Sequence, residues 1–199
     1  MTHDARREFY VTAITILENA QLSFSLLRDQ LVDLSWWESK VGAVSDAKRM
    51  SVMKEFALMV KWFTFHTLAM AVDETLGAVQ RAAPNVFHIF GHPTLKKTYT
   101  KVLEVTGKQE LKPFLDVLRE TRNTIHTNGI YSQPGVNSRS YMVNGEEFKF
   151  EFGRILEWFH DQRLIWFADN IAVTMNTIIK SSEVSTINNC PRGFPRNSR

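Results

Sequence analysis

The sequence predicts an all-α fold: an antiparallel helical bundle of four long helices plus one shorter helix, with a β-hairpin inserted before the last helix. Apolar residues recur every three or four positions along most of the chain, which indicates helices with one buried face. Alternation of apolar and polar residues in one short segment indicates the hairpin. The 199 residues, 44% of them hydrophobic, suffice for one substantial core, so we expect a single domain over residues 1–180.

The first long helix is predicted over residues 5–31, where apolar positions recur at intervals of three and four. A loop with two adjacent tryptophans follows. A second long helix is predicted from residue 47 to about residue 80, with Ser45 or Asp46 as its N-cap. Its middle is apolar nearly all round, so we expect a central, buried helix.

A shorter helix and another long helix are predicted next. Prolines in residues 82–93 mark a connection, and residues 94–106 then form the shorter helix, which ends at Gly107. The next long helix runs from about residue 109 to residue 127. Pro113 lies in its first turn, where the missing N–H costs little.

The hairpin and the last helix are predicted from a change of period. Residues 140–153, SYMVNGEEFKFEFG, alternate around Asn144-Gly145, a pair that favours a two-residue hairpin turn because both positions take a positive φ. Residues 154 to about 180 return to helical spacing. Residues 181–199 lack periodicity and are rich in Pro, Gly, Asn and Ser, so we expect a flexible C-terminal tail.

The overall charge does not by itself indicate a nucleic-acid-binding protein. The net charge is +3 and the isoelectric point is near 9.0. Three arginines against one glutamate in residues 181–199 supply +2 of this charge, which leaves +1 for residues 1–180. Evidence for RNA binding must therefore come from a local patch.

Cysteine content and hydropathy indicate a cytoplasmic protein that does not enter a membrane. A single cysteine, Cys190, excludes an internal disulfide and a cysteine-cluster zinc site. The most apolar segment, residues 56–72, contains Lys61 and His66 and is shorter than the ~20 residues of a membrane span. The N-terminal residues carry charges of both signs and no apolar run of signal-peptide length.

The segment LRETRNTIHTNGIY, residues 118–131, carries the candidate site. Arg119, Arg122, Asn123 and His126 stand at positions i, i+3, i+4 and i+7, which share one face of a helix that turns about 100° per residue. One interpretation is structural. Cations in the last turn favour the partial negative charge of the helix end by about 0.3–1 kcal/mol each, with the following Asn-Gly pair as the C-cap.

The second interpretation is catalytic. An imidazole transfers protons near neutral pH, and a guanidinium holds a phosphate through two hydrogen bonds. These groups support RNA cleavage in which the ribose 2′-OH attacks the adjacent phosphate. His126 moves the proton and Arg119 or Arg122 stabilises the transition state, so no metal ion is required. The candidate substrate contacts are Asn123, Asn128 and Tyr131.

The stretch RNTIHTNGIY, which closes a helix and is followed by a hairpin and one more long helix, resembles the HEPN superfamily. Catalytic HEPN members carry an Arg, four to six intervening residues and a His, commonly with a polar residue after the Arg. Many are metal-independent ribonucleases that dimerise with two motifs face to face, and many act as toxins of toxin–antitoxin pairs or in phage defence. The resemblance covers about residues 45–180. It implies an RNA-cleaving homodimer, with a regulatory protein as a further partner.

The spacing of the motif differs from the family pattern, and this leaves two alternatives open. Three residues separate Arg122 from His126, whereas six separate Arg119 from His126, but Glu120 follows Arg119 directly. Some family members are not catalytic. The first alternative is therefore an inert HEPN-type module that binds a protein or a nucleotide, and the second is a helical scaffold whose Arg and His residues merely end a helix.

Other polar groups are explained more simply by structure. His66 is expected to be buried and hydrogen-bonded. His88 and His92 are four residues apart but lack a third ligand, so no metal is expected. No Gly-rich phosphate loop, nucleophile elbow or paired-carboxylate signature is present, and we expect no cofactor. Solvated surfaces are expected for His160, Asp161 and Arg163, and for Lys96, Lys97 and Lys101 beside Tyr99.

Overall fold

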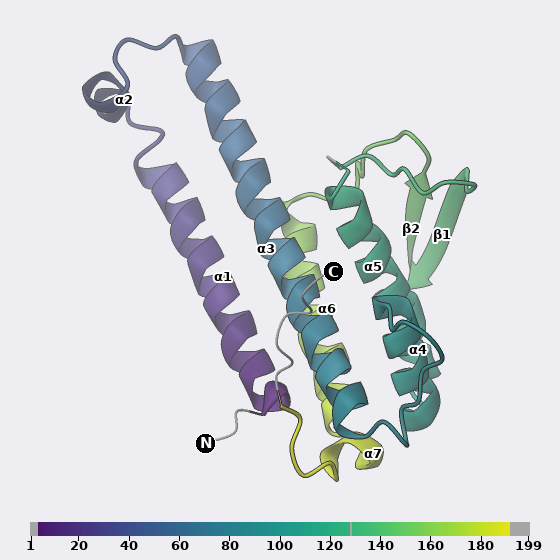
Figure 1. Cartoon of the computed structure of the whole chain (residues 1–199). Helices are drawn as coiled ribbons and strands as arrows, with labels where there is room; N and C mark the ends of the chain where they lie inside the picture. Colours follow the sequence, from purple (N-terminus) through teal and green to yellow (C-terminus); the bar gives the residue numbers. More distant parts are fainter. Residues whose placement is uncertain (1–3, 128, 192–199) are drawn as a thin grey trace.

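The computed structural model describes residues 4–127 and 129–191. These residues form seven α-helices, one short 3-10 helix and a two-stranded antiparallel sheet (Figure 1). The predominantly helical fold with a hairpin before the last long helix is therefore confirmed. No helix within the described ranges is long and apolar enough to cross a membrane. The elements are α1 (Ala5–Asp29), α2 (Leu34–Lys40), α3 (Asp46–Ala82), α4 (Leu95–Thr106), η1 (Gln109–Leu111), α5 (Lys112–Ile125), β1 (Ser138–Val143), β2 (Glu146–Glu151), α6 (Asp161–Ile179) and α7 (Ser182–Ser185).

The longest helices, α1 and α3, lie side by side, and the beginning of α3 extends beyond α4, α5 and α6 (Figure 1). All buried residues of α3 lie between Thr64 and Val79. The expectation of a buried central helix is thus correct for the second half of α3 and wrong for the first. The reason is that α4, α5 and α6 pack mainly against the second half, with the Lys61–Asp161 ion pair near the boundary between the halves, so most of the first half keeps one side exposed.

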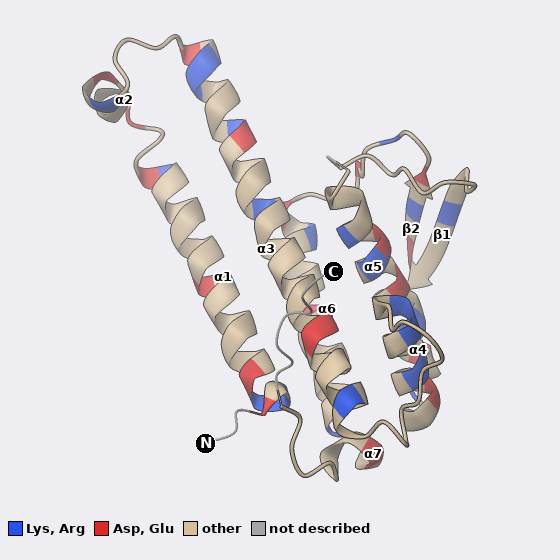
Figure 2. Cartoon of the chain, viewed as in Figure 1, with Lys and Arg blue, Asp and Glu red and all other residues tan. Residues whose placement is uncertain are grey.

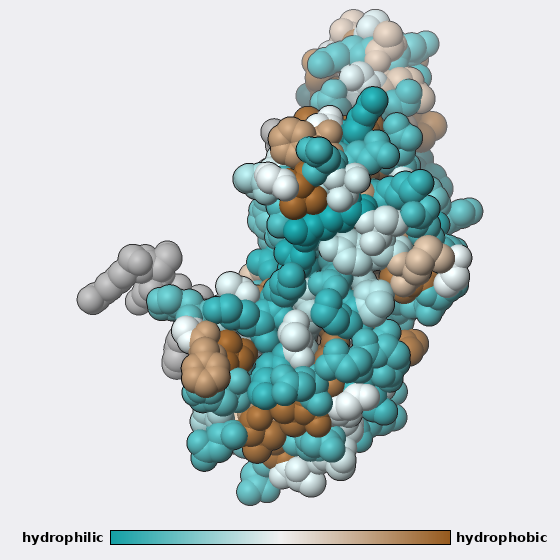
Figure 3. Space-filling model, turned by 90° about the vertical axis from the view of Figure 1, so that its right-hand side faces the viewer, coloured by the Kyte–Doolittle hydropathy of each residue, from teal (hydrophilic) through white to brown (hydrophobic). Residues whose placement is uncertain are grey.

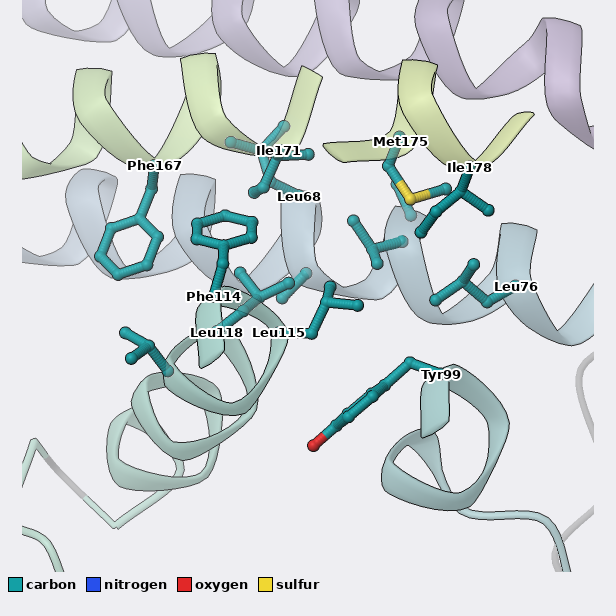
Figure 4. Packing of buried hydrophobic residues seen from close by; sticks show 14 of the residues in the cluster. Leu68, Leu76, Tyr99, Phe114, Leu115, Leu118, Phe167, Ile171, Met175 and Ile178 are labelled. Carbon is teal, nitrogen blue, oxygen red and sulfur yellow. The ribbon is translucent and has the colours of Figure 1, made fainter. Parts of the chain in front are cut away.

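The core lies where α3 meets α4, α5 and α6. Apolar side chains of the four helices interdigitate there, and each buried leucine-sized side chain contributes about 1.5–3 kcal/mol (Figure 4). Tyr99 of α4 is fully buried, and its hydroxyl points away from the aliphatic side chains. The hydroxyl donates to the carboxylate of Asp116 on α5, so the polar group is satisfied inside the core.

The hairpin forms as predicted around Asn144-Gly145, whose φ angles are 52° and 82°. Glu146 pairs with Val143 at the turn, and the inward positions of β2 are Phe148 and Phe150, both buried. Contacts of β1 with α5 place the sheet beside the helix that carries the candidate motif. The sheet therefore braces α5 from the side away from α3 (Figure 1).

The loop expected between the first two long helices contains a short helix, α2. Asp33 starts this helix because its carboxylate accepts from the backbone N–H of Ser35 at 2.9 Å. The indole N–H of Trp37 donates to the carbonyl of Leu31 at 2.7 Å, which holds the buried ring against the preceding turn. The N-cap signal at Asp33 explains the difference from the predicted loop.

The last long helix begins at Asp161, not at residue 154 as predicted. The preceding segment pairs with the chain that leaves α5. The N–H of Tyr131 donates to the carbonyl of Arg154 at 3.0 Å, and the N–H of Gly153 donates to the carbonyl of Tyr131 at 2.8 Å. Phe159 is buried in the core. These tertiary contacts outweigh the helical spacing of the segment.

The expectation of a flexible tail from residue 181 is wrong for residues 181–191. Val184 in α7 and Cys190 are fully buried, and the carbonyl of Cys190 accepts from the N–H of Ala5 at 2.8 Å. Arg6 donates to the carbonyl of Val184 at 2.7 Å. The beginning of α1 therefore holds this segment in place. Residues 192–199 lie outside the described residues.

Candidate functional site

The candidate motif lies along α3, which runs antiparallel to α5. Three successive contacts define this alignment. Arg122 pairs with Asp73, His126 contacts His66, and Gly129 lies against Trp62. Residues successively closer to the C-terminal end of α5, and just beyond it, therefore contact residues successively closer to the N-terminal end of α3. The helical face predicted from the spacing of the motif is directed at a second helix and not at open solvent alone.

The two histidines form an edge-to-face pair. Their ring centroids are 4.6 Å apart and the ring planes are inclined at 85°. His126 is exposed at the C-cap of α5, whereas His66 is half-buried on α3. The expected hydrogen bond of a buried His66 is not observed within the described chain, where its buried Nδ1 has no partner. Sequence reasoning missed this pair because the two residues lie on different helices.

The environment of His66 keeps its imidazole neutral. Burial lowers the pKa of His66, and the nearby His126 and Arg122 lower this pKa further because a second positive charge is unfavourable beside them. At neutral pH the ring is therefore unprotonated and able to accept a proton.

Arg122, one turn before His126 on α5, forms a weak ion pair. Its Nη1 donates to the carboxylate of Asp73 at 3.3 Å, and both side chains remain partly exposed. Its Nε is buried and has no partner among the described atoms. A long, partly solvated ion pair contributes at most about 1 kcal/mol, so an incoming anion can compete for this guanidinium.

Arg119 is fixed more firmly. Its Nη2 donates to Glu120 Oε1 at 2.5 Å. The same oxygen accepts from Arg139 at 2.7 Å and from the hydroxyl of Tyr141 at 3.3 Å, both on β1. Glu120 is only 1% exposed. This buried carboxylate therefore joins the hairpin to α5 and fixes the helix that carries the motif.

A cleft of about 930 Å³ opens between α3, α4 and α5. Four cationic side chains and two carboxylates line it. Positive residues are visible along α4 and α5, while the middle of α1 is nearly free of charge (Figure 2). The face that carries α4, α5 and the hairpin is mainly hydrophilic (Figure 3). The charged lining residues are Asp73, Glu74, Arg81, Lys96, Arg119 and Arg122.

Only some of the predicted site residues line the cleft. Arg119, Arg122 and Asn123 line the cleft together, and His126 lies one turn further along α5. Tyr131 is 2% exposed and its hydroxyl donates to Gln133 at 2.9 Å, so its assignment as a substrate contact is wrong. The ring belongs to the core because it packs against the hairpin. Asn128 lies outside the described residues.

The other histidines do not form a metal centre in the described part of the chain. No three His, Cys, Asp or Glu side chains are grouped there as metal ligands. The ring of His88 packs edge-on against Phe90, with centroids 4.6 Å apart. This contact gives His88 a packing role.

No family model, curated protein or solved structure matches the chain. The resemblance to the HEPN superfamily therefore rests on the motif of α5 and on the order of the helices and the hairpin around it.

Proposed function

We propose that this chain is a HEPN-like helical bundle that cleaves RNA as a metal-independent endoribonuclease. The supporting observation is the pair of imidazoles, His66 and His126, next to Arg122 at the end of a cationic cleft. Two imidazoles supply both proton transfers of the reaction, and the arginine supplies positive charge for the phosphate.

In the proposed reaction, neutral His66 accepts the proton of the ribose 2′-OH as the 2′-oxygen attacks the adjacent phosphorus. The bond from phosphorus to the 5′-oxygen breaks, and His126 in its protonated form donates a proton to the leaving oxygen. The products are a 2′,3′-cyclic phosphate and a 5′-hydroxyl. Each imidazole ends in the protonation state of the other, and exchange with water restores the starting state.

Arg122 is the proposed phosphate ligand at the reacting centre. Binding of the phosphate replaces its ion pair with Asp73, which is long and partly solvated. Arg119 has a supporting role, since Glu120 already occupies part of its guanidinium. Asn123, exposed on the same face, donates or accepts hydrogen bonds to the strand.

The proposal includes a homodimer, which the exposed apolar side chains near the histidine pair support. Phe63 and Met59 of α3 are 71% and 64% exposed, and Phe63 precedes His66 by three residues. Contact of two copies across this surface removes both side chains from water. A toxin or phage-defence role, a regulatory protein partner and a cytoplasmic location belong to the same proposal, and the single free thiol, Cys190, fits a reducing compartment.

The alternative is an inert HEPN-type module that binds a protein or a nucleotide. The ion pairs of Arg119 with Glu120 and of Arg122 with Asp73 favour it, because both guanidiniums are already neutralised. The separation of only three residues between Arg122 and His126 also favours it.

The deciding experiment measures RNA cleavage in EDTA by the wild-type protein and by His126→Ala. General acid catalysis contributes about 10²- to 10⁴-fold, so we expect a rate loss of that size with the fold retained. His160→Ala is the matched control, since His160 is exposed on a loop outside the cleft. Unchanged cleavage by His126→Ala refutes the assignment. Binding of RNA without cleavage by the wild type supports the inert module.

A further inference from the structure

The end of the cleft opposite the histidine pair contains two more cations, Arg81 and Lys96. Arg81 lies in the last turn of α3 and Lys96 in the first turn of α4. Both side chains are exposed, and neither forms an ion pair with any residue in the ranges that the structure describes. The sequence pattern predicts an ordinary solvated surface for Lys96 and indicates no role for Arg81.

The backbone around Gly77 allows Arg81 to lie over the cleft. Gly77 lines the cleft one turn before Arg81, and a Cβ atom at Gly77 would be 3.1 Å from Arg81 Nη1. The guanidinium therefore folds back across the glycine toward the interior of the cleft. A methyl group at this position would be in tight contact with the guanidinium, which would have to shift by a few tenths of an ångström.

Hydrogen bonds fix the first turn of α4, which lines the cleft together with Arg81. Lys97 donates to the carbonyls of Phe90 and His92 at 3.2 and 3.4 Å, which ties the preceding loop to the helix. Thr94 caps the helix by accepting from the N–H of Lys97 at 3.3 Å. Pro93, Thr94 and Leu95 line the cleft together with Lys96, so the partial positive charge of the helix start adds to that of the two side chains.

The excess positive charge of the cleft is concentrated at this end. Arg122 is neutralised by Asp73, and Arg119 by the buried Glu120. Arg81 and Lys96 together carry two positive charges against the single negative charge of Glu74, the other carboxylate of the lining, and this excess attracts an anion that enters the cleft. They are well separated from the proposed reacting centre: the guanidinium of Arg81 lies over Gly77, which is 11 positions after His66, about 16 Å along the helix.

We propose that Arg81 and Lys96 form a second phosphate-binding site, which holds the RNA backbone several nucleotides away from the cleaved bond. This inference rests on the proposed ribonuclease function and specifies its substrate. A stacked strand rises about 3.4 Å per nucleotide, so about 16 Å corresponds to roughly five nucleotides. The substrate is therefore a single-stranded segment at least about five nucleotides long on one side of the cut, and not a mononucleotide or dinucleotide.

The test measures binding of 2′-O-methyl RNA oligonucleotides of 3, 6, 9 and 12 nucleotides, which lack the attacking hydroxyl and stay intact. The variants are the double substitution Arg81→Ala with Lys96→Ala and, as a control with the same loss of charge, Lys48→Ala with Lys54→Ala. Lys48 and Lys54 are exposed on the other half of α3. Circular dichroism confirms that each variant keeps its helix content.

We expect wild-type affinity to rise between 3 and 9 nucleotides and the Arg81/Lys96 variant to lose that rise. Loss of two phosphate contacts lowers the slope of log affinity against log salt by about 1.4 for a single strand. The control variant keeps the length dependence. Equal behaviour of the two double variants, or absence of binding by the wild type, overturns the second phosphate site.

The two proposals fail in different ways. If His126→Ala leaves cleavage unchanged but the Arg81/Lys96 variant still loses the length dependence, the ribonuclease assignment fails and the phosphate site remains. If RNA cleavage depends on His126 while the Arg81/Lys96 variant binds and cleaves long RNA like the wild type, the phosphate site fails and the ribonuclease assignment remains.

Discussion

His66 on α3 and His126 at the end of α5 face each other edge to face, with ring centroids 4.6 Å apart. The half-buried ring of His66 has a lowered pKa, and the ring of His126 is exposed to solvent. Two chemically identical side chains are thus placed in different environments. Such a difference allows one imidazole to accept a proton while the other donates one.

The lowered pKa of His66 predicts a pH dependence of folding stability. Below the unfolded-state pKa, near 6.5, the unfolded chain binds a proton at His66 that the folded chain still excludes. The unfolded state is then favoured, so the free energy of unfolding falls as the pH decreases through and below about 6.5. We expect His66→Phe, which retains an aromatic ring, to weaken this dependence in urea unfolding between pH 8 and pH 5.

His160→Phe provides the comparison for this pH series. His160 is exposed, so its substitution removes an imidazole without removing a buried one. The same slope of stability against pH in wild type and His66→Phe would show that His66 titrates alike in the folded and unfolded states.

Substitution of Asp73 is expected to release Arg122 for an anion. Asp73→Asn removes the negative charge 3.3 Å from the guanidinium and keeps the shape of the side chain. We expect the affinity for 2′-O-methyl RNA to increase about five-fold, which corresponds to about 1 kcal/mol. Fluorescence anisotropy measures the change. Asp169→Asn, an equal change of charge at an exposed position of α6, is the control, and an equal gain in both variants contradicts a specific role for Asp73.

The set of polar side chains that share one face of α5 could be predicted from the sequence, because it depends only on the local geometry of the helix. A rotation of about 100° per residue places Arg119, Arg122 and Asn123 on one face, and all three line one cleft. The Asn144-Gly145 turn was predictable for the same reason, since the positive φ angles are a property of the two residues themselves.

The partners of this face could not be predicted. Asp73 is 49 residues from Arg122, and nothing local to either residue indicates that α3 and α5 run antiparallel in this register. A charged residue such as Glu120 is expected in solvent, yet β1 supplies two donors that compensate its burial. Helical spacing alone likewise placed the start of α6 too early in the sequence. Hydrogen bonds between the segment before α6 and the chain that leaves α5 decide where the helix begins.

Glu120 is expected to contribute strongly to stability. Glu120→Gln removes the negative charge that holds Arg119 and Arg139, and leaves two partly buried guanidinium groups without that counter-charge. Loss of one partner from a buried ion pair destabilises by about 3–5 kcal/mol, and we expect a loss in this range by urea unfolding. Glu110→Gln is the control, since Glu110 is exposed on η1 and such surface changes stay within about 0.5 kcal/mol. A loss no larger than that of the control excludes a structural role for Glu120.

Gly129 is expected to be essential for the close approach of α3 to the end of α5. Its φ is +78°, and an added Cβ atom would lie 2.8 Å from the ring of Trp62. Gly135 has nearly the same φ, +75°, but open space around it. Gly135→Ala therefore measures the backbone strain alone, about 1–2 kcal/mol. We expect Gly129→Ala to cost a further 1–3 kcal/mol, approximately, from the clash with the indole ring.

The double-mutant cycle with Trp62→Leu separates the two contributions at Gly129. If the clash is the cause, the free energy lost on Gly129→Ala decreases in the Trp62→Leu background toward the value for Gly135→Ala, because the smaller side chain leaves room for the methyl group. Equal losses in both backgrounds would mean that strain at the positive φ accounts for the whole effect. Circular dichroism during urea unfolding gives all four free energies.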